Sequence, residues 1–180
     1  MNRRYLMMLV LLLAMAAGCS LAFAEEGVTL RTPSVFSYVA PPGWTSQVAG
    51  GLTLGGFPQA VGPASNNFTP DITFMTHGYA SLAQYAQTYQ PRLIDMTPRT
   101  FPLKLVDQTP FVTAAGVKGI RLHSIDPASP PIAVQYSYVF LNSDGLICEF
   151  ACACAPVDAA HDLPIFDASM KTARLLRTGE

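Results

Sequence analysis

The segment IAVQYSYVFLNSDGLICEFACACA, residues 132–155, predicts two β-strands joined by a tight turn. Residues 132–140 are rich in β-branched and aromatic side chains, which favour strands. Turn-forming Asn, Asp and Gly gather at residues 142–145, and residues 146–155 return as a second strand. We therefore expect an antiparallel hairpin at this position.

The second strand of this hairpin carries apolar side chains on both faces, because successive side chains of a strand point to opposite sides. One face carries Leu146, Cys148, Phe150, Cys152 and Cys154. The other face carries Ile147, Glu149, Ala151, Ala153 and Ala155. A strand of this kind is covered on both sides, so we expect it at the centre of an α/β sandwich.

The three cysteines Cys148, Cys152 and Cys154 allow three interpretations: packing in the core, metal binding or a redox role. On a straight strand, Cys148 and Cys152 lie about 13 Å apart, whereas a disulfide needs Cα atoms within roughly 7 Å. A straight strand also cannot gather three sulfurs around one metal ion. A break near Pro156 would let Cys152, Cys154 and His161 converge. We take core packing as the first interpretation, and keep a metal site of the three cysteines and His161 as the alternative.

Two helices are expected outside the hairpin. Ser81 is a suitable N-cap for the first, because its hydroxyl can accept a hydrogen bond from an amide of the first turn. Pro91 would kink or end this helix. Its apolar residues recur at helical spacing: Leu82, Tyr85, Ala86, Tyr89 and Leu93. The second helix is expected at residues 163–176, with a buried stripe of Phe166, Met170 and Ala173 or Leu176.

Further strands are predicted before the hairpin. Residues 28–44 are extended up to a turn at Pro41-Pro42-Gly43, and Trp44 is expected to enter the core just after it. Residues 71–76 predict one strand, and residues 103–125 predict two or three. The expected fold is of the α/β class, an α+β sandwich in which a single antiparallel sheet is flanked by helices.

The first 24 residues carry the features of a secretory signal peptide. Arg3 and Arg4 precede an apolar run over residues 5–17, and small residues follow it. This run is shorter than the about 20 residues that a transmembrane helix needs. Residues 25–180 contain no repeat, low-complexity tract or linker, and are long enough for one domain with its own core.

Two cleavage sites compete at the end of the signal peptide. Ala22-Phe23-Ala24 is an A-x-A site, which would release a soluble protein beginning at Glu25. Ala16-Ala17-Gly18-Cys19 resembles a bacterial lipobox, in which Cys19 would be lipidated and would become the first mature residue. Both products would lie outside the cytoplasm of a bacterium, in the periplasm or another extracytoplasmic location. Only the second would be attached to a membrane, through Cys19.

Charge and motifs exclude several classes of function. The chain has 11 Lys and Arg against 12 Asp and Glu, and its basic residues form no cluster of the kind that nucleic-acid binding needs. The sequence has no nucleotide-binding glycine motif, no Gly-x-Ser-x-Gly elbow and no His-Glu-x-x-His motif. His77, His123 and His161 show no regular spacing. We therefore expect no cofactor and no enzymatic activity.

Tyrosines give the best indication of a binding surface. Tyr136 and Tyr138 share one face of the first hairpin strand, while Tyr85 and Tyr89 share one face of the first helix. These side chains either pack the sheet against the helix, with their hydroxyls at the rim, or line a pocket or partner surface between them. Both interpretations stay open at this point.

Four short segments mark the order of the expected elements: Tyr38-Val39-Ala40-Pro41-Pro42-Gly43-Trp44, Ser81-Leu82 with Tyr85, Gly116-Val117-Lys118-Gly119-Ile120-Arg121 and Met170-Lys171-Thr172-Ala173-Arg174. This order resembles that of the PsbP-like superfamily, which includes the periplasmic DcrB-like proteins, over about residues 28–174. The resemblance implies an antiparallel sheet with helices on its faces and an accessory or binding role without catalysis. It carries over no functional residue.

These observations together predict an exported, non-catalytic accessory or binding protein of PsbP-like or DcrB-like type. Its partner would be an unknown protein or small molecule and not a nucleic acid. The alternative function is a cysteine-based metal-binding protein that uses the cluster at residues 148–154.

Overall fold

The computed structural model describes residues 29–31, 36–48, 58–79, 81–90, 92–94, 100–142 and 145–176. The predicted signal peptide, both of its cleavage sites and Cys19 lie outside the described residues. No helix among those that are described has both the length and the apolar composition needed to cross a membrane.

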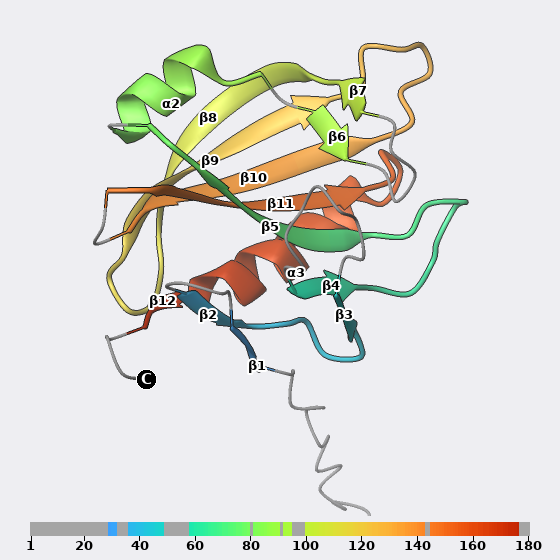
Figure 1. Cartoon of the computed structure of the whole chain (residues 1–180). Coiled ribbons are helices and arrows are strands. Elements are labelled where there is room, and N and C mark those ends of the chain that lie inside the picture. Colours follow the sequence, from blue (N-terminus) through green and yellow to red (C-terminus); the bar gives the residue numbers. More distant parts are fainter. Residues whose placement is uncertain are drawn as a thin grey trace, which may run out of the picture.

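A seven-stranded antiparallel sheet is the main element of the fold (Figure 1). Its strands lie in the order β3-β4-β5-β11-β10-β9-β8. Their bounds are β3 (Thr45–Val48), β4 (Pro58–Val61), β5 (Asp71–His77), β8 (Lys104–Val112), β9 (Lys118–Ile125), β10 (Val134–Leu141) and β11 (Ile147–Cys154). The strands predicted at residues 71–76 and 103–125 are therefore confirmed, the latter as a pair.

The predicted hairpin is confirmed as β10 and β11, which pair in antiparallel register from Val134↔Cys154 to Leu141↔Ile147. β11 lies at the centre of the sheet, between β5 and β10, and all of its residues are buried. This agrees with the expectation from its two apolar faces, because only a central strand of a layered fold is covered on both sides.

A second, smaller sheet corrects the prediction of a single sheet. It has the order β1-β2-β12 and is formed by β1 (Thr29–Arg31), β2 (Phe36–Val39) and β12 (Arg174–Leu175). A two-stranded ribbon is formed by β6 (Arg92–Ile94) and β7 (Thr100–Pro102). The turn before Trp44, with Gly43 at φ 76°, separates β2 from β3, so that β2 packs across the main sheet and does not extend it.

The first predicted helix is confirmed as α2 (Leu82–Thr88), and Ser81 is its N-cap. The amide of Gln84 donates to Ser81 Oγ at 3.1 Å. The helix ends earlier than its apolar spacing suggested, since Tyr89 is already extended and Leu93 lies in β6. The approach to Pro91 explains this end, because a residue before proline disfavours the helical conformation.

The second helix, α3 (Ala159–Lys171), is shifted toward the N-terminus of the range predicted for it. Its stripe of Phe166, Met170 and Ala173 is buried, as expected. The chain after Lys171 pairs with β2: the amide of Val39 donates to Thr172 Oγ1 at 2.7 Å, and Arg174 lies opposite Ser37. Arg174 and Leu175, which helical spacing had assigned to the last turn of this helix, therefore form β12 of the small sheet.

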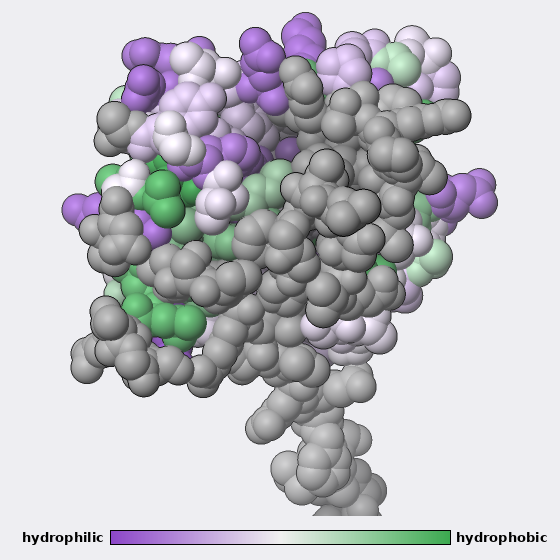
Figure 2. All heavy atoms as spheres, in the orientation of Figure 1, coloured by the Kyte–Doolittle hydropathy of each residue, from purple (hydrophilic) through white to green (hydrophobic). Residues whose placement is uncertain are grey.

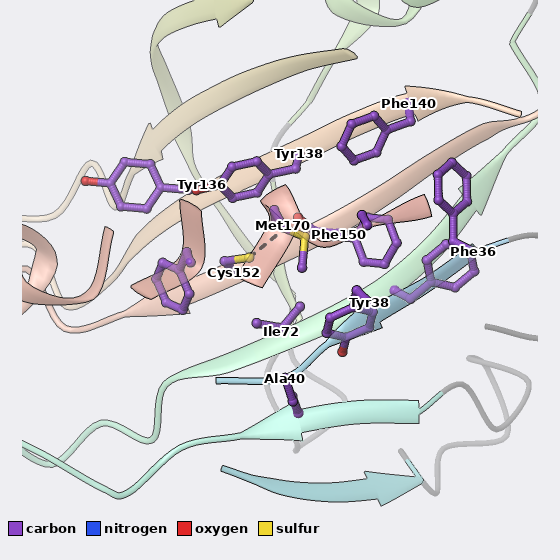
Figure 3. Packing of buried hydrophobic residues seen from close by; sticks show 14 of the residues in the cluster. Phe36, Tyr38, Ala40, Ile72, Tyr136, Tyr138, Phe140, Phe150, Cys152 and Met170 are labelled. Carbon is purple, nitrogen blue, oxygen red and sulfur yellow. Dashed lines mark hydrogen bonds between the residues drawn. The ribbon is translucent and has the colours of Figure 1, made fainter. Parts of the chain in front are cut away.

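The hydrophobic core lies between the main sheet and the layer formed by α3 and β2 (Figure 3). Phe150 is at its centre, with ring centroids at 5.1–6.0 Å from those of four neighbours: Phe36, Tyr38, Phe74 and Phe140. Trp44 is buried and meets the Phe166 ring edge-on at 5.9 Å, which confirms its predicted place in the core. We call this side of the sheet the α3 face.

Candidate binding site

The opposite side of the main sheet, which we call the α2 face, carries polar side chains. Six of the eleven buried polar or charged residues in the described part of the chain lie there: Gln59, Thr73, Ser124, Gln135, Ser137 and Glu149. They come from five neighbouring strands and alternate with the apolar residues of the α3 face. Buried polar groups need hydrogen-bond partners, so the contacts of this set decide its role.

Glu149 is the centre of the largest polar group on this face. It is 2 % exposed. Tyr85 Oη donates to Oε2 at 2.5 Å, and Tyr89 Oη donates to Oε1 at 3.1 Å. A further hydrogen bond of 2.8 Å joins Oε2 to His77 Nε2. Helix α2 and strand β5 thus meet at one carboxylate of β11.

The charge of Glu149 is stabilised in spite of its burial. Burial raises the pKa of this carboxyl, but hydrogen bonds from His77, Ser137 and Tyr85 outweigh it, and the pKa lies below its usual value. Burial and the neighbouring carboxylate raise the pKa values of Tyr85 and Tyr89. Both phenols therefore remain protonated donors to an ionised Glu149 at neutral pH.

A second set of hydrogen bonds fastens α2 to β10. Tyr89 Oη and Ser137 Oγ lie 2.7 Å apart. Gln135 Nε2 donates to Ser137 Oγ at 3.0 Å and to Tyr89 Oη at 3.3 Å. We call the connected set of Glu149, His77, Tyr85, Tyr89, Gln135 and Ser137 the Glu149 cluster.

The Glu149 cluster reaches solvent beside α2. The side chain of His77 is 30 % exposed, and its ring lies 5.1 Å from that of Tyr85. The Tyr85 ring also contacts Tyr79 at 5.0 Å and Tyr89 at 5.3 Å. Figure 2 shows hydrophilic residues gathered at the top of the molecule, around α2 and β8. The outer side of α2 is therefore polar, and its inner side holds the aromatic rings.

The four tyrosines singled out from the sequence do not line one surface. Tyr85 and Tyr89 lie on the α2 face, whereas Tyr136 and Tyr138 lie on the α3 face. Tyr138 Oη donates to Asp167 Oδ1 of α3 at 2.7 Å. The sheet separates the two pairs, because Tyr136 and Tyr138 alternate along β10 with residues that face α2.

The three cysteines lie in the core cluster of the α3 face, fully buried, as the packing interpretation predicted. Burial raises the pKa of Cys154 to about 12 and that of Cys152 well above its usual value. The side chain of His161 is 78 % exposed and is hydrogen-bonded to Asp162 Oδ1 at 2.8 Å. Across the described ranges, no three His, Cys, Asp or Glu side chains are grouped to hold a metal ion. The structure thus does not bring the four residues of the metal hypothesis together.

The sequence analysis did not predict the contact between Glu149 and His77. Glu149 is the only charged residue in the segment 146–155, on a strand expected to be buried on both faces. A buried charge of this kind needs partners, so this signal could have identified it. Nothing in the sequence indicated that His77 would be the partner, since the two lie 72 positions apart.

No protein-family model matches the chain. A search of curated proteins also finds no match. Solved structures do match in fold. The solution structure of cyanobacterial PsbP (CyanoP) from Synechocystis sp. PCC 6803 has a TM-score of 0.56 at 12 % identity, covering 89 % of this chain and 98 % of that one.

The crystal structure of LpqN, described as involved in cell envelope biogenesis of Mycobacterium tuberculosis, has a TM-score of 0.51 at 12 % identity. The match covers 84 % of this chain and 86 % of LpqN. Both similarities extend over most of this chain. The chain therefore has the PsbP-like fold.

Proposed function

We propose that this chain is an exported, non-catalytic accessory or binding protein that acts outside the cytoplasm. The PsbP-like fold supports an accessory role. The signal-like first 24 residues support export, and the involvement of LpqN in cell envelope biogenesis is consistent with that location.

The observation that carries the proposal is that the three cysteine thiols and the carboxylate of Glu149 are buried, and that Glu149 is already hydrogen-bonded. The thiols of Cys152 and Cys154 are held protonated by burial, whereas a nucleophilic or redox-active cysteine needs an accessible thiolate. Glu149 is closed off by donors from α2 and β5, so it is not available as a general base. A molecule of this kind acts by binding.

The location is tested by fractionating bacterial cells that express the full chain, followed by N-terminal sequencing of the mature protein. We expect the protein in the extracytoplasmic fractions, beginning at Glu25 or, if it is lipidated, at Cys19. Replacing Arg3, Arg4 and the apolar run should retain it in the cytoplasm. A wild-type chain that stays in the cytoplasm at full length contradicts the proposal.

The absence of thiol chemistry is tested by titrating thiols in the native and unfolded protein, purified without reductant. We expect Cys148, Cys152 and Cys154 to react only after unfolding. An engineered cysteine at the exposed residue Val157 provides the matched control and should react at once in the native state. Rapid native reaction of any of the three natural cysteines would overturn the non-catalytic assignment.

A further inference from the structure

A second polar group lies on the α2 face at the start of β5, apart from the Glu149 cluster. Gln59 Nε2 donates to Asp71 Oδ2 and, at 2.9 Å, to Thr73 Oγ1. Thr73 Oγ1 in turn donates to Asp71 Oδ2 at 2.8 Å. Both donors thus go to one carboxylate oxygen. Within the described part of the chain, Asp71 Oδ1 accepts no hydrogen bond.

Gln59 supplies a second unused acceptor. The residue is 6 % exposed, and its Oε1 atom is buried without a hydrogen-bond partner in the described ranges. Oε1 lies beside the carboxylate, because the nitrogen of the same amide contacts Asp71 Oδ2. A buried carbonyl oxygen without a donor is unfavourable. The Asp71–Gln59 pair thus has two oxygen atoms, Asp71 Oδ1 and Gln59 Oε1, that accept no hydrogen bond from the described residues.

The charge at this position also favours a cationic donor. Burial raises the pKa of Asp71 to about 6, although hydrogen bonds from Thr73 and Gln59 lower it. The other titratable groups that interact with Asp71 are Tyr38 on β2 and Cys152 on β11. Their pKa values are raised, so both are neutral near pH 7. The carboxylate thus has no cationic neighbour among the described side chains that interact with it.

We propose that Asp71 and Gln59 form a binding site for the protonated amine of a ligand, an alkylammonium group. This inference rests on the proposed function, because it names the ligand chemistry of a binding protein. An ammonium group has three donors and no acceptor, so it matches two unused acceptors and leaves one hydrogen for water. Asp71 is only partly buried, which gives such a group access to the carboxylate, whereas Gln59 Oε1 is buried and is contacted only when the group displaces the side chains that cover it.

A divalent metal ion fits this position less well than an amine. Calcium takes about six to eight oxygen ligands. Asp71 Oδ1 and Gln59 Oε1 offer two, since the other oxygen of Asp71 already accepts two hydrogen bonds. The charge and the number of acceptors together select the alkylammonium group.

The test is a titration of the purified mature protein with n-butylammonium chloride, followed by the backbone amide NMR signals of Gln59, Asp71 and Thr73. We expect saturable shifts that 1-butanol, the neutral analogue, does not cause. Lowering the pH from 7 to 5 should weaken binding about tenfold, because Asp71 is protonated over this range.

Variants locate the site. Asp71→Asn keeps an acceptor for Gln59 and Thr73 but removes the charge, so it should weaken binding at least about tenfold. Asp107→Asn removes the same charge from an exposed position on β8 and should leave binding unchanged. A titration with N-acetyl-lysine methylamide separates the two sources of the group. Tighter binding of this compound indicates a lysine side chain of a partner, and tighter binding of n-butylammonium indicates a free amine.

The inference is overturned if n-butylammonium gives no saturable shift, if 1-butanol matches it, or if Asp71→Asn binds as the natural chain does. A response to calcium chloride without a response to the amine would also overturn it. These results leave the proposed function standing, provided that the protein is exported and its thiols are inert. Cytoplasmic retention or native thiol reactivity would remove the proposed function whatever the amine does.

Discussion

The two faces of the seven-stranded sheet are buried by different means. On the α3 face, nineteen buried residues of the described part of the chain form one apolar cluster around Phe150. On the α2 face, the apolar cluster beneath α2 has four buried residues, and hydrogen bonds to Glu149 and Ser137 complete the contact. Apolar packing is tolerant of direction, whereas hydrogen bonds require defined partners. We therefore expect the α3 face to supply most of the stability and the α2 face to supply specificity.

The largest expected effect comes from the α3 face. Phe150→Ala removes a fully buried ring that contacts four others, and should lower the free energy of unfolding by about 3–5 kcal/mol. Urea denaturation followed by circular dichroism measures it. Ile72→Ala on the α3 face and Ile147→Ala on the α2 face are the matched comparison, since both side chains are fully buried, and the second should cost less. Equal losses at the two positions would break the distinction between the faces.

Glu149→Gln tests the polar face. The amide places a donor where Tyr85, Tyr89 and His77 require an acceptor, so the free energy of unfolding should fall by about 2–4 kcal/mol at neutral pH. Tyr85→Phe removes one of the donors and should cost less. A loss below about 0.5 kcal/mol for Glu149→Gln would mean that packing alone holds α2.

The pH dependence of this effect has a defined sign. The pKa of Glu149 is lower in the folded chain than in the unfolded chain, so its charge stabilises the fold above the unfolded value. This contribution is lost as the pH falls through the lowered folded value. The stability difference between the natural chain and Glu149→Gln should therefore shrink below about pH 4. A difference that grows on acidification would contradict the assignment of an ionised Glu149.

Asp71→Asn should have the opposite sign. The pKa of Asp71 is raised from 3.8 to about 6, so the folded chain favours its protonated form, and stability falls as the pH rises through this window. At pH 7 the variant should be more stable than the natural chain by up to about 3 kcal/mol, and near pH 4 most of this difference should be gone. Thermal melts at the two pH values measure the difference. A destabilised variant at pH 7 would show that the charge of Asp71 is compensated within the fold.

The smallest effect is expected at the surface. Val157 is 75 % exposed, in the turn before α3, and Val157→Ser should change the free energy of unfolding by less than about 0.5 kcal/mol. The same urea titration measures it and sets the baseline for the other variants. A larger loss would mean that this apolar side chain has a partner surface in solution.

The fold could be predicted best from the sequence where apolar residues recur with a regular period or a single residue marks the start of a helix. The alternation along residues 146–155 predicted a central strand, and Ser81 predicted the start of α2, because both signals are local. The small sheet could not be predicted in the same way. β12 pairs with β2 across more than a hundred residues, and its two residues, Arg174 and Leu175, carry no periodicity of their own.

In the candidate site, too, local features could be predicted from the sequence and contacts between distant segments could not. The tyrosines of α2 were found from helical spacing, and their burial against the sheet agrees with that spacing. Glu149, His77 and Ser137 come from three strands that are adjacent only in the folded sheet, so their contact depends on strand order. Asp71 and Gln59 are closer in sequence, but their pairing depends on the register of β4 with β5.

The pairing of β2 with β12 has a consequence for how the protein is oriented. It brings the first and last described strands together on the side of the main sheet opposite to α2 (Figure 1). A chain attached to a surface through its N-terminal end would therefore be attached on the side of the small sheet, opposite to the α2 face. His77 and its neighbours lie on the far side of the main sheet from that end of the chain.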